Sequence, residues 1–308
     1  MKEYYSIAVL GAGLMGHGIA QIFAQQGIRV NIYDPDTEVL KTVPTRVKGI
    51  CYLLDEDPTC IKRIKLCTTM AAVVEGVDLV IEAASEKIDI KRDIFAQLVH
   101  LCSKETILAS NTSVIPISDI ARDLGDRDAQ RVVGTHFWNP PYLIPLVEVI
   151  PGERTHSSTL ETTVELLTSV GKEAVAIQQD VVVGNRLQHA LWREAISMVD
   201  QGICDAATVD SIVKNTLGLR LKVLGPLENS DLIGLPLTKD IHDVVLPQLS
   251  CAVKPSSVLD FYIDSGKYGM SSGEGFYRWT EAQRSDKRQE ISEHLIEILK
   301  DKKIASNS

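Results

Sequence analysis

Short apolar runs alternate with longer stretches of helical spacing along the first half of the chain. Four runs of four or five mainly apolar residues are typical of buried strands, at positions 6–10, 29–33, 78–82 and 106–109. The stretches between them predict helices at about 14–26, 36–54 and 88–102. Strands that alternate with helices of this length predict a doubly wound, mainly parallel α/β sheet with helices on both faces.

The pattern changes to helices alone from about Leu187. An apolar stripe of the kind that packs on another helix is formed by Ala190, Leu191, Ala195 and Val199. Further helices are expected at 209–217, 235–249, 257–265 and 290–299. We therefore expect an α/β domain over residues 1–183 and an all-α domain over residues 184–308. The second domain has more apolar faces than one small helical cluster can bury, which predicts dimerisation through it.

A glycine-rich turn, GAGLMG at 11–16, connects the first strand to the first helix. Gly11 permits a tight turn, Gly13 lets the backbone approach a pyrophosphate, and Gly16 lets the helix pack closely on the strand. Leu14 and Met15 open the helix, whose free N–H groups bind phosphate. A strand, this turn and a helix in that order predict a Rossmann-type dinucleotide-binding domain.

Polar residues follow the other expected strands. Asp34 ends the second strand and can accept hydrogen bonds from the ribose hydroxyls of a dinucleotide, whereas it would repel a 2′-phosphate. No arginine follows it closely, so NAD is predicted rather than NADP. The segments 82–86 and 110–113, with Asn111, also follow strands. Because ligands bind such sheets outside the carboxyl ends of the strands, these groups are expected to line one cofactor crevice.

A histidine and a glutamate lie in two apolar segments on either side of the turn Asn139-Pro140-Pro141. A histidine side chain can accept a proton from a hydroxyl group, which makes His136 a candidate general base. Glu148 lies in a segment that should be largely buried, and a buried carboxylate needs a partner. The imidazolium that forms during proton transfer would be a suitable one. The pair alone is weak evidence, since a core histidine and a surface glutamate are both ordinary.

Three other candidates have equally ordinary structural interpretations. Ser113 precedes Val114-Ile115-Pro116 and can cap a helix. Glu86 and Lys91 fit an exposed charge pattern on a helix.

Composition excludes several classes of function. The 308 residues are 44% hydrophobic and 24% charged, as in an ordinary globular protein. A net charge of −9 argues against nucleic-acid binding and against an anionic membrane surface. No apolar run approaches the roughly 20 residues of a membrane span, and glycines interrupt the apolar stretch 6–24, which is not expected to be a signal peptide. The six cysteines have no metal-like spacing, so we expect reduced thiols in a cytoplasmic protein and no metal site.

Sequence blocks along nearly the whole chain resemble the 3-hydroxyacyl-CoA dehydrogenases. The blocks are GAGLMGHGIA at 11–20, EAASE at 82–86, SNTS at 110–113, HFWNP at 136–140, LVEV at 146–149, NR at 185–186, GP at 225–226 and GEGFY at 273–277. Several are specific to that family, and chance does not explain their shared order.

The resemblance implies a role for each matching residue. His136 would be the catalytic base for the 3-hydroxyl group, with Glu148 holding and stabilising its ring. Ser113 and Asn185 would hydrogen-bond the substrate oxygens and help to order the nicotinamide.

The resemblance also implies the cofactor and the assembly. NAD would be the cofactor, and Glu86 and Lys91 would lie near its nicotinamide ribose. The helical domain would form the substrate cleft and the interface of a homodimer.

Departures from the family pattern bear on the substrate. Acyl-CoA members usually carry a long helical hairpin after the second strand, and the distance from Asp34 to Asp78 is short for one. Ile144-Pro145 replaces the usual Met-Lys, and 181–184 replaces Pro-Gly-Phe before Asn185. The run NPPYLIP resembles relatives that oxidise free small acids, the L-gulonate, L-carnitine and pyridine-carboxylate dehydrogenases. We therefore expect a small 3-hydroxy acid, or a hydroxymethyl or aldehyde compound with a carboxylate.

Three alternatives stay open. The blocks at 225–226 and 273–277 look more like the acyl-CoA members, so a short-chain (3S)-3-hydroxyacyl-CoA such as 3-hydroxybutyryl-CoA is the second candidate substrate. A catalytically vestigial NAD-binding protein would lack turnover. An NADP-linked β-hydroxyacid dehydrogenase of the other helical family would use a catalytic lysine and lack the block that holds His136 and Glu148.

Overall fold

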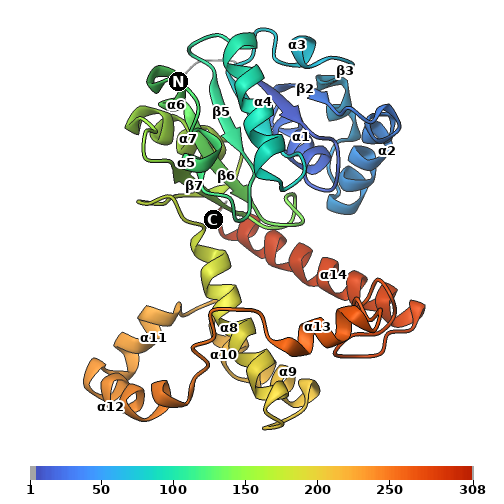
Figure 1. Ribbon diagram of the computed structural model, residues 1–308. Coiled ribbons are helices and arrows are strands. Elements are labelled where there is room, and N and C mark those ends of the chain that lie inside the picture. Colours follow the sequence, from blue (N-terminus) through green and yellow to red (C-terminus); the bar gives the residue numbers. More distant parts are fainter. Residues whose placement is uncertain (1–4, 307–308) are drawn as a thin grey trace. The chain divides into compact units, whose positions relative to one another are not determined.

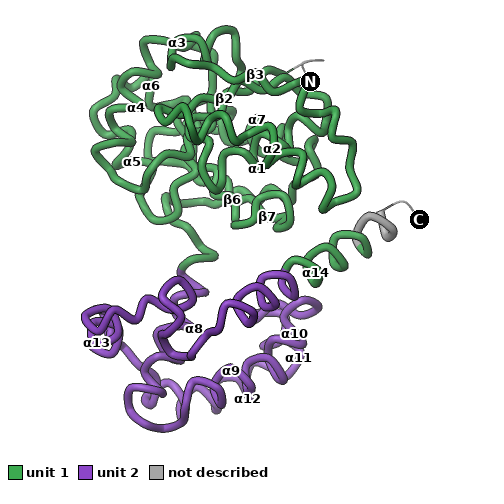
Figure 2. The backbone as a smooth tube through the Cα atoms, turned by 90° about the vertical axis from the view of Figure 1, so that its right-hand side faces the viewer, with its two compact units in different colours: residues 1–185, 292–308 green, residues 186–291 purple. Residues whose placement is uncertain are grey.

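The computed structural model describes residues 5–306, and their side chains as far as residue 301. The chain divides into two compact units (Figure 2). The first comprises residues 1–185 with 292–308, and the second comprises residues 186–291. The boundaries fall inside two long helices, α8 (Val183–Asp200) and α14 (Glu281–Ser306).

The first unit is built on an eight-stranded sheet in the order β3-β2-β1-β4-β5-β6-β7-β8. All neighbouring strands are parallel except β6 and β7. The strands are β1 Ser6–Leu10, β2 Arg29–Tyr33, β3 Ile64–Cys67, β4 Leu79–Glu82, β5 Ile107–Ser110, β6 Val132–Phe137, β7 Leu146–Pro151 and β8 Glu173–Ala176. The predicted Rossmann-type α/β architecture is confirmed.

Helices cover both faces of this sheet (Figure 1). They are α1 Gly16–Gln25, α2 Thr37–Leu54, the 3₁₀ helix η1 Pro58–Arg63, α3 Met70–Val73, α4 Ile88–Leu101, α5 Ile117–Ile120, α6 Asp126–Ala129 and α7 Ser157–Ser169. Strand β1 shows the division of the core. Ile7 and Val9 belong to the cluster that contains α1, α2 and α7, whereas Ala8 and Leu10 belong to the cluster that contains α3, α4 and α5. Successive side chains of a strand point to opposite faces, so one strand contributes to both cores.

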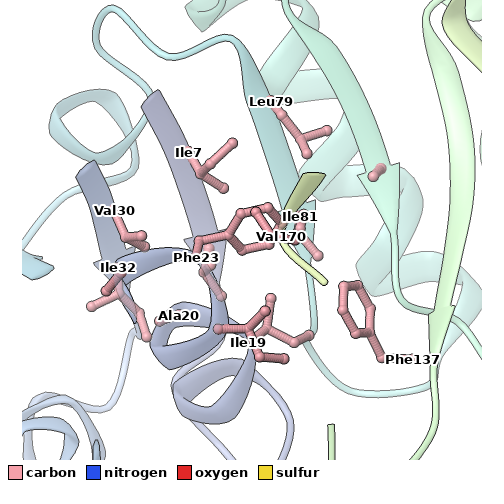
Figure 3. Packing of buried hydrophobic residues seen from close by; sticks show 14 of the residues in the cluster. Ile7, Ile19, Ala20, Phe23, Val30, Ile32, Leu79, Ile81, Phe137 and Val170 are labelled. Carbon is pink, nitrogen blue, oxygen red and sulfur yellow. The ribbon is translucent and has the colours of Figure 1, made fainter. Parts of the chain in front are cut away.

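Helix α1 is fixed against the sheet by its apolar side. Phe23 and Ile19 are fully buried and lie over β1, β2 and β4, beside Ile7 and Ile81 (Figure 3). Burying one such side chain stabilises the fold by about 1.5–3 kcal/mol. This packing holds the glycine-rich turn at the carboxyl end of β1.

A short connection follows α2. The helix ends at Leu54 and is followed by Asp55, which has a left-handed φ of 54°. After a short turn, the six residues of η1 lead directly into β3. No second long helix stands between Leu54 and Ile64, all of which are described. The sequence pattern did not reveal β3, because this strand is short and exposes Lys65 and Leu66.

The second unit contains only helices and turns. Besides its parts of α8 and α14 it holds α9 Ala206–Asn215, α10 Leu217–Arg220, α11 Pro226–Ile233, α12 Leu235–Val245, η2 Leu246–Gln248 and α13 Ser257–Asp264. The all-helical expectation is confirmed, although α14 is longer than the apolar pattern at 290–299 indicates. Its first residues are polar but mostly good helix formers. Of residues 186–291, all described, Val209 alone has a buried side chain.

Candidate active site

The antiparallel pairing of β6 and β7 places His136 directly opposite Glu148. His136 Nδ1 lies 2.9 Å from Glu148 Oε2. The two residues are 4% and 3% exposed, so water screens the interaction little. The structure therefore brings the two residues together as one buried pair.

The other oxygen of Glu148 is held by the start of α8. Glu148 Oε1 accepts hydrogen bonds from the backbone N–H groups of Val183 (2.8 Å) and Gly184 (3.0 Å). Burial by itself would raise the pKa of Glu148. The hydrogen bonds from His136 and from these backbone groups outweigh burial and hold the pKa below its ordinary value. The carboxyl group is therefore ionised at neutral pH.

The state of Glu148 fixes the tautomer of His136. An ionised carboxylate can only accept hydrogen bonds, so His136 Nδ1 must carry the hydrogen and donate it. Nε2 is then left with a free lone pair. This arrangement suits a general base whose imidazolium is stabilised as it forms.

The glycine-rich turn is shaped for close backbone approach. Gly11 has a φ of +96°, and a Cβ there would lie 2.5 Å from the carbonyl oxygen of Ala83. A Cβ on Gly16 would lie 1.8 Å from the carbonyl oxygen of Gly11. Gly13 differs, because a Cβ there would meet no atom within 4 Å. Gly11 and Gly16 are thus required by the fold, whereas the open space at Gly13, next to the start of α1, fits a pyrophosphate. Leu14 and Met15 complete the turn at this opening, with Leu14 exposed.

Asp34 is tied to the same turn. Its Oδ2 accepts the N–H of Ala12 (2.7 Å) and its Oδ1 accepts the N–H of Asp36 (2.9 Å). The carboxylate is half-buried at the end of β2, where an adenosine ribose would be reached. Arg46, on α2, donates to the carbonyl oxygens of Ala12 (2.9 Å) and Gly13 (3.1 Å) and so fixes the turn from outside.

A buried ion cluster lies at the carboxyl end of β4. Lys91 Nζ is 2.8 Å and 3.0 Å from the two oxygens of Glu82 and 3.2 Å from Glu86 Oε2. Ser110 donates to Glu82 at 2.6 Å. Glu82 and Lys91 have no exposed side-chain surface, whereas Glu86 is 36% exposed. Of the two residues placed beside the nicotinamide ribose by resemblance, Glu86 is therefore the one that a ligand can reach.

Glu86 in turn holds the loop that carries Ser113. Its Oε1 accepts the hydroxyl of Thr112 (2.5 Å) and the N–H groups of Ser113 (2.9 Å) and Val114 (3.2 Å). Burial opposes ionisation, but these bonds and Lys91 hold the pKa of Glu86 below its ordinary value.

Ser113 lies beside Asn185 in the structure. Asn185 Nδ2 donates to the carbonyl oxygen of Ser113 at 2.6 Å, which joins the start of α8 to this loop. Ser113 does not cap the following short helix, since the residue at the N-cap of α5 is Pro116. The capping interpretation of Ser113 is therefore not supported.

Asn111 connects the crevice to the histidine strand. Its backbone N–H bonds the carbonyl of Glu82 (2.7 Å), and its Oδ1 accepts the N–H of Phe137 (2.9 Å), the residue after His136.

The turn after His136 is fixed by a buried lysine. Lys172 Nζ donates to the carbonyl oxygens of Pro141 (2.5 Å) and Ile144 (3.0 Å). Burial lowers the pKa of Lys172 to about 8.

Three residues that build this site were not singled out as functional from the sequence. They are Arg46, Trp138 and Gly184. Glu82 was expected only as part of the segment 82–86 at the crevice, and its ion pair with Lys91 was not predicted. Glu82 had a signal, because an acid within a buried strand needs a partner. Arg46 and Gly184 had none, since each acts on a segment distant in sequence.

Two family models match the chain. Residues 6–181 match the NAD binding domain of 3-hydroxyacyl-CoA dehydrogenase, and residues 182–279 match its C-terminal domain.

Known proteins are similar over most of the chain. A 5-formyl-3-hydroxy-2-methylpyridine 4-carboxylate 5-dehydrogenase of Mesorhizobium japonicum is 31% identical over 300 residues, which are 95% of this chain and 96% of that protein. A probable 3-hydroxybutyryl-CoA dehydrogenase of Deinococcus radiodurans is 38% identical over 280 residues, which are 88% of this chain and 99% of that protein.

Solved structures of the same two kinds are also similar. A crystal structure of a 5-dehydrogenase for that pyridine acid, described as an NAD⁺-dependent dismutase, has a TM-score of 0.88 at 30% identity and covers 96% of this chain and 97% of that one. A crystal structure of (S)-3-hydroxybutyryl-CoA dehydrogenase from Ralstonia eutropha has a TM-score of 0.73 at 27% identity. The match covers 91% of this chain and 100% of that one.

The described part of the chain has neither a helix suited to span a membrane nor a cluster of metal-binding side chains. None of its helices is long and apolar enough to cross a membrane. Residues 5–306 bring together no group of three His, Cys, Asp or Glu side chains that could hold a metal ion.

Proposed function

The chain belongs to the 3-hydroxyacyl-CoA dehydrogenase family as an NAD-dependent oxidoreductase that acts on CH–OH donors, and from this premise we propose that His136 is its general base. The observation that carries the proposal is the buried hydrogen bond of 2.9 Å between His136 Nδ1 and Glu148. It leaves Nε2 as the proton acceptor and places an ionised carboxylate beside the charge that develops. The open space at Gly13 and the carboxylate of Asp34 suit the cofactor.

The proposed reaction removes a hydride and a proton from one carbinol. NAD, when bound, supplies the hydride acceptor. His136 Nε2 takes the hydroxyl proton, and Glu148 stabilises the resulting imidazolium. The backbone N–H groups of Val183 and Gly184 keep Glu148 ionised throughout. This pair can exclude water because both of its members are buried.

The flanking residues are proposed to orient the reactants. Ser113 and Asn185, joined at 2.6 Å, would hydrogen-bond the substrate oxygens and help to order the nicotinamide. Glu86 would lie beside the nicotinamide ribose. The buried Lys91 would not contact the ribose itself but would hold the carboxylate of Glu86 in place. Asn111 would set the end of β6.

A free small acid is the proposed substrate class. An enzyme that uses CoA gains binding energy from remote contacts to its nucleotide and pantetheine arm. Acyl-CoA members usually carry a helical hairpin after the second strand. Here only the six-residue η1 follows α2, so the surface that could contact CoA is small. The pyridine-acid dehydrogenase of similar length supports this choice. The 38% identity to a probable 3-hydroxybutyryl-CoA dehydrogenase favours the second candidate, a short acyl-CoA.

Homodimerisation through the helical domain is part of the proposal. Large apolar side chains are exposed along α8, α11 and α12 of the second unit, where Val209 is the only buried residue in 186–291. A partner surface would cover them. The cytoplasm is the proposed compartment, supported by the six cysteines, which are all free thiols in the structure.

A substrate comparison tests the activity. We expect NADH formation from 3-hydroxybutyrate or a related free acid, and loss of it in His136→Gln. If 3-hydroxybutyryl-CoA gives kcat/KM above roughly 10⁵ M⁻¹s⁻¹ and free acids give nothing, the second candidate is correct. A vestigial protein would bind NADH and turn over neither class.

A further inference from the structure

We propose that Arg46 and His17 are positioning residues of the cofactor site, because they hold the carbonyl groups of the glycine-rich turn and thereby direct its N–H groups at the pyrophosphate of NAD. The inference goes beyond the proposed function. It concerns how the cofactor is bound, and it depends neither on the substrate nor on the role of His136.

Two side chains donate hydrogen bonds to the carbonyl groups of the turn. Arg46 donates through Nη1 to Ala12 (2.9 Å) and through Nη2 to Gly13 (3.1 Å). His17 Nδ1 lies 2.7 Å from the same carbonyl oxygen of Gly13. A carbonyl oxygen can only accept, so Nδ1 must carry the hydrogen. The carbonyl group of Gly13 is therefore held by two donors at once.

The two carbonyl groups determine where two N–H groups of the turn point. In a planar trans peptide the C=O and the following N–H point in opposite directions. The carbonyl of Ala12 therefore sets the N–H of Gly13, and the carbonyl of Gly13 sets the N–H of Leu14. Neither N–H has a hydrogen-bond partner among the described residues. Both are directed away from the two side chains and are free to donate to a phosphate.

Packing alone does not fix these peptide units. A Cβ on Gly13 would meet no atom within 4 Å, so no neighbouring side chain limits rotation of the backbone there. Glycine also permits more backbone conformations than other residues do. If the peptide after Gly13 rotated, a carbonyl dipole would face the negatively charged pyrophosphate in place of an N–H group. The hydrogen bonds from Arg46 and His17 oppose this rotation.

Packed helices place both donors. Val43 and Val47, on either side of Arg46 in the sequence of α2, are fully buried in the core that contains α1. His17 is itself buried in the first turn of α1. Burial lowers the pKa of His17, the hydrogen bond to Gly13 raises it in part, and the charge of Arg46 lowers it further. The ring is therefore neutral at pH 7, and Arg46 supplies the positive charge beside the turn.

Two ligands distinguish the turn from the rest of the cofactor site. ADP-ribose carries the pyrophosphate and adenosine does not, and calorimetric titration of the protein measures the affinity for each. In Arg46→Met we expect the affinity for ADP-ribose to fall at least about tenfold, because two charge-assisted hydrogen bonds to the turn are lost. The affinity for adenosine should stay within about threefold of wild type, since Asp34 still faces the ribose.

Two further variants control for charge. Arg46→Lys keeps the charge but not the two-point fork of the guanidinium, so its affinity for ADP-ribose should lie between those of wild type and Arg46→Met. Lys48→Met removes a positive charge from an exposed position of the same helix and should change neither affinity.

The second donor is tested by a matched pair of variants. His17→Leu removes the N–H and should lower the affinity for ADP-ribose by about two- to tenfold. In His17→Asn the amide nitrogen can replace Nδ1 as the donor to Gly13, and the affinity should return to within about twofold of wild type. The pair separates the hydrogen bond from the loss of the imidazole ring.

Several results would overturn the inference. Equal losses for ADP-ribose and adenosine in Arg46→Met would show that the turn is not the part affected. A loss in Lys48→Met as large as that in Arg46→Met would show that long-range charge is sufficient. Equal affinities in the two His17 variants would remove the second donor. His136→Gln should bind ADP-ribose as wild type does, so a failure of the proposed base leaves this test intact.

Discussion

The ammonium of Lys91 lies 2.8 Å from Glu82 Oε1, and neither side chain has any exposed surface. Such a lysine cannot reach a solvent-borne ligand directly. Its second contact, 3.2 Å to Glu86 Oε2, leads to the loop that carries Ser113. The buried pair therefore acts on the crevice by positioning Glu86.

Lys91→Met should lower the free energy of unfolding. Removing the ammonium leaves Glu82 as a buried charge without its counter-ion, and breaking a buried pair costs about 3–5 kcal/mol. Urea denaturation measures the change in the free energy of unfolding. In the double variant Lys91→Met/Glu82→Gln, the loss in the free energy of unfolding should be much smaller than the sum of the losses in the two single variants. The reason is that both changes remove the same interaction.

Lys41→Met is the matched control for this prediction. Lys41 pairs with Glu38 at 2.7 Å on the exposed face of α2, where an ion pair contributes about 0–1 kcal/mol. Additive losses in the Lys91 and Glu82 variants would show that the two side chains are not coupled.

His136→Gln should lower turnover by about 10²–10⁴-fold, the usual contribution of a general base. Glutamine keeps a hydrogen-bonding side chain but cannot take the proton. NADH affinity, followed by fluorescence titration, should change little. His100→Gln, at an exposed position on α4, is the control and should behave as wild type. Near-normal turnover in His136→Gln would remove His136 from the reaction.

Glu148 should make the protein sensitive to acid. Its pKa is lower in the folded state than the ordinary value of 4.5, because hydrogen bonds from His136 and the backbone outweigh burial. The stability this provides is complete above the ordinary pKa and is lost as the pH falls through the folded value. Urea midpoints measured from neutral pH to about pH 3 should therefore fall less steeply in Glu148→Gln than in wild type. An equal slope in the two proteins would contradict this coupling, and Glu161→Gln, on the exposed surface of α7, provides the baseline.

Local pattern was enough to predict the glycine-rich turn and the central strands of the sheet, although not the edge strands β3 and β8. Both depend on contacts between neighbours in sequence: the conformation of Gly11 follows from the tight turn, and the strands follow from short apolar runs. The pairing of His136 with Glu148 could also be predicted, because one short connection joins their two strands. The antiparallel register then places the two residues opposite each other.

Long-range placement was not accessible in the same way. That Lys91 is buried depends on α4 lying over the end of β4, so an exposed charge pattern was an equally good interpretation of the sequence. Position 184 needs a glycine because the indole of Trp138, distant in sequence, leaves no room for a Cβ there. No periodicity records a contact of that kind.

Asp34 should decide between the two nicotinamide cofactors. Its carboxylate, held by the N–H groups of Ala12 and Asp36, would meet the 2′-phosphate of NADP as a like charge. NADP should therefore bind at least about tenfold more weakly than NAD, a difference of about 1.4 kcal/mol. Asp34→Asn, which keeps one acceptor for the turn and removes the charge, should narrow this gap. Asp34→Ser should narrow it too, with a larger loss of NAD affinity because the bonds to Ala12 and Asp36 weaken. Titration of wild type and both variants with each cofactor gives the comparison, and equal wild-type affinity for NAD and NADP would refute the role assigned to Asp34.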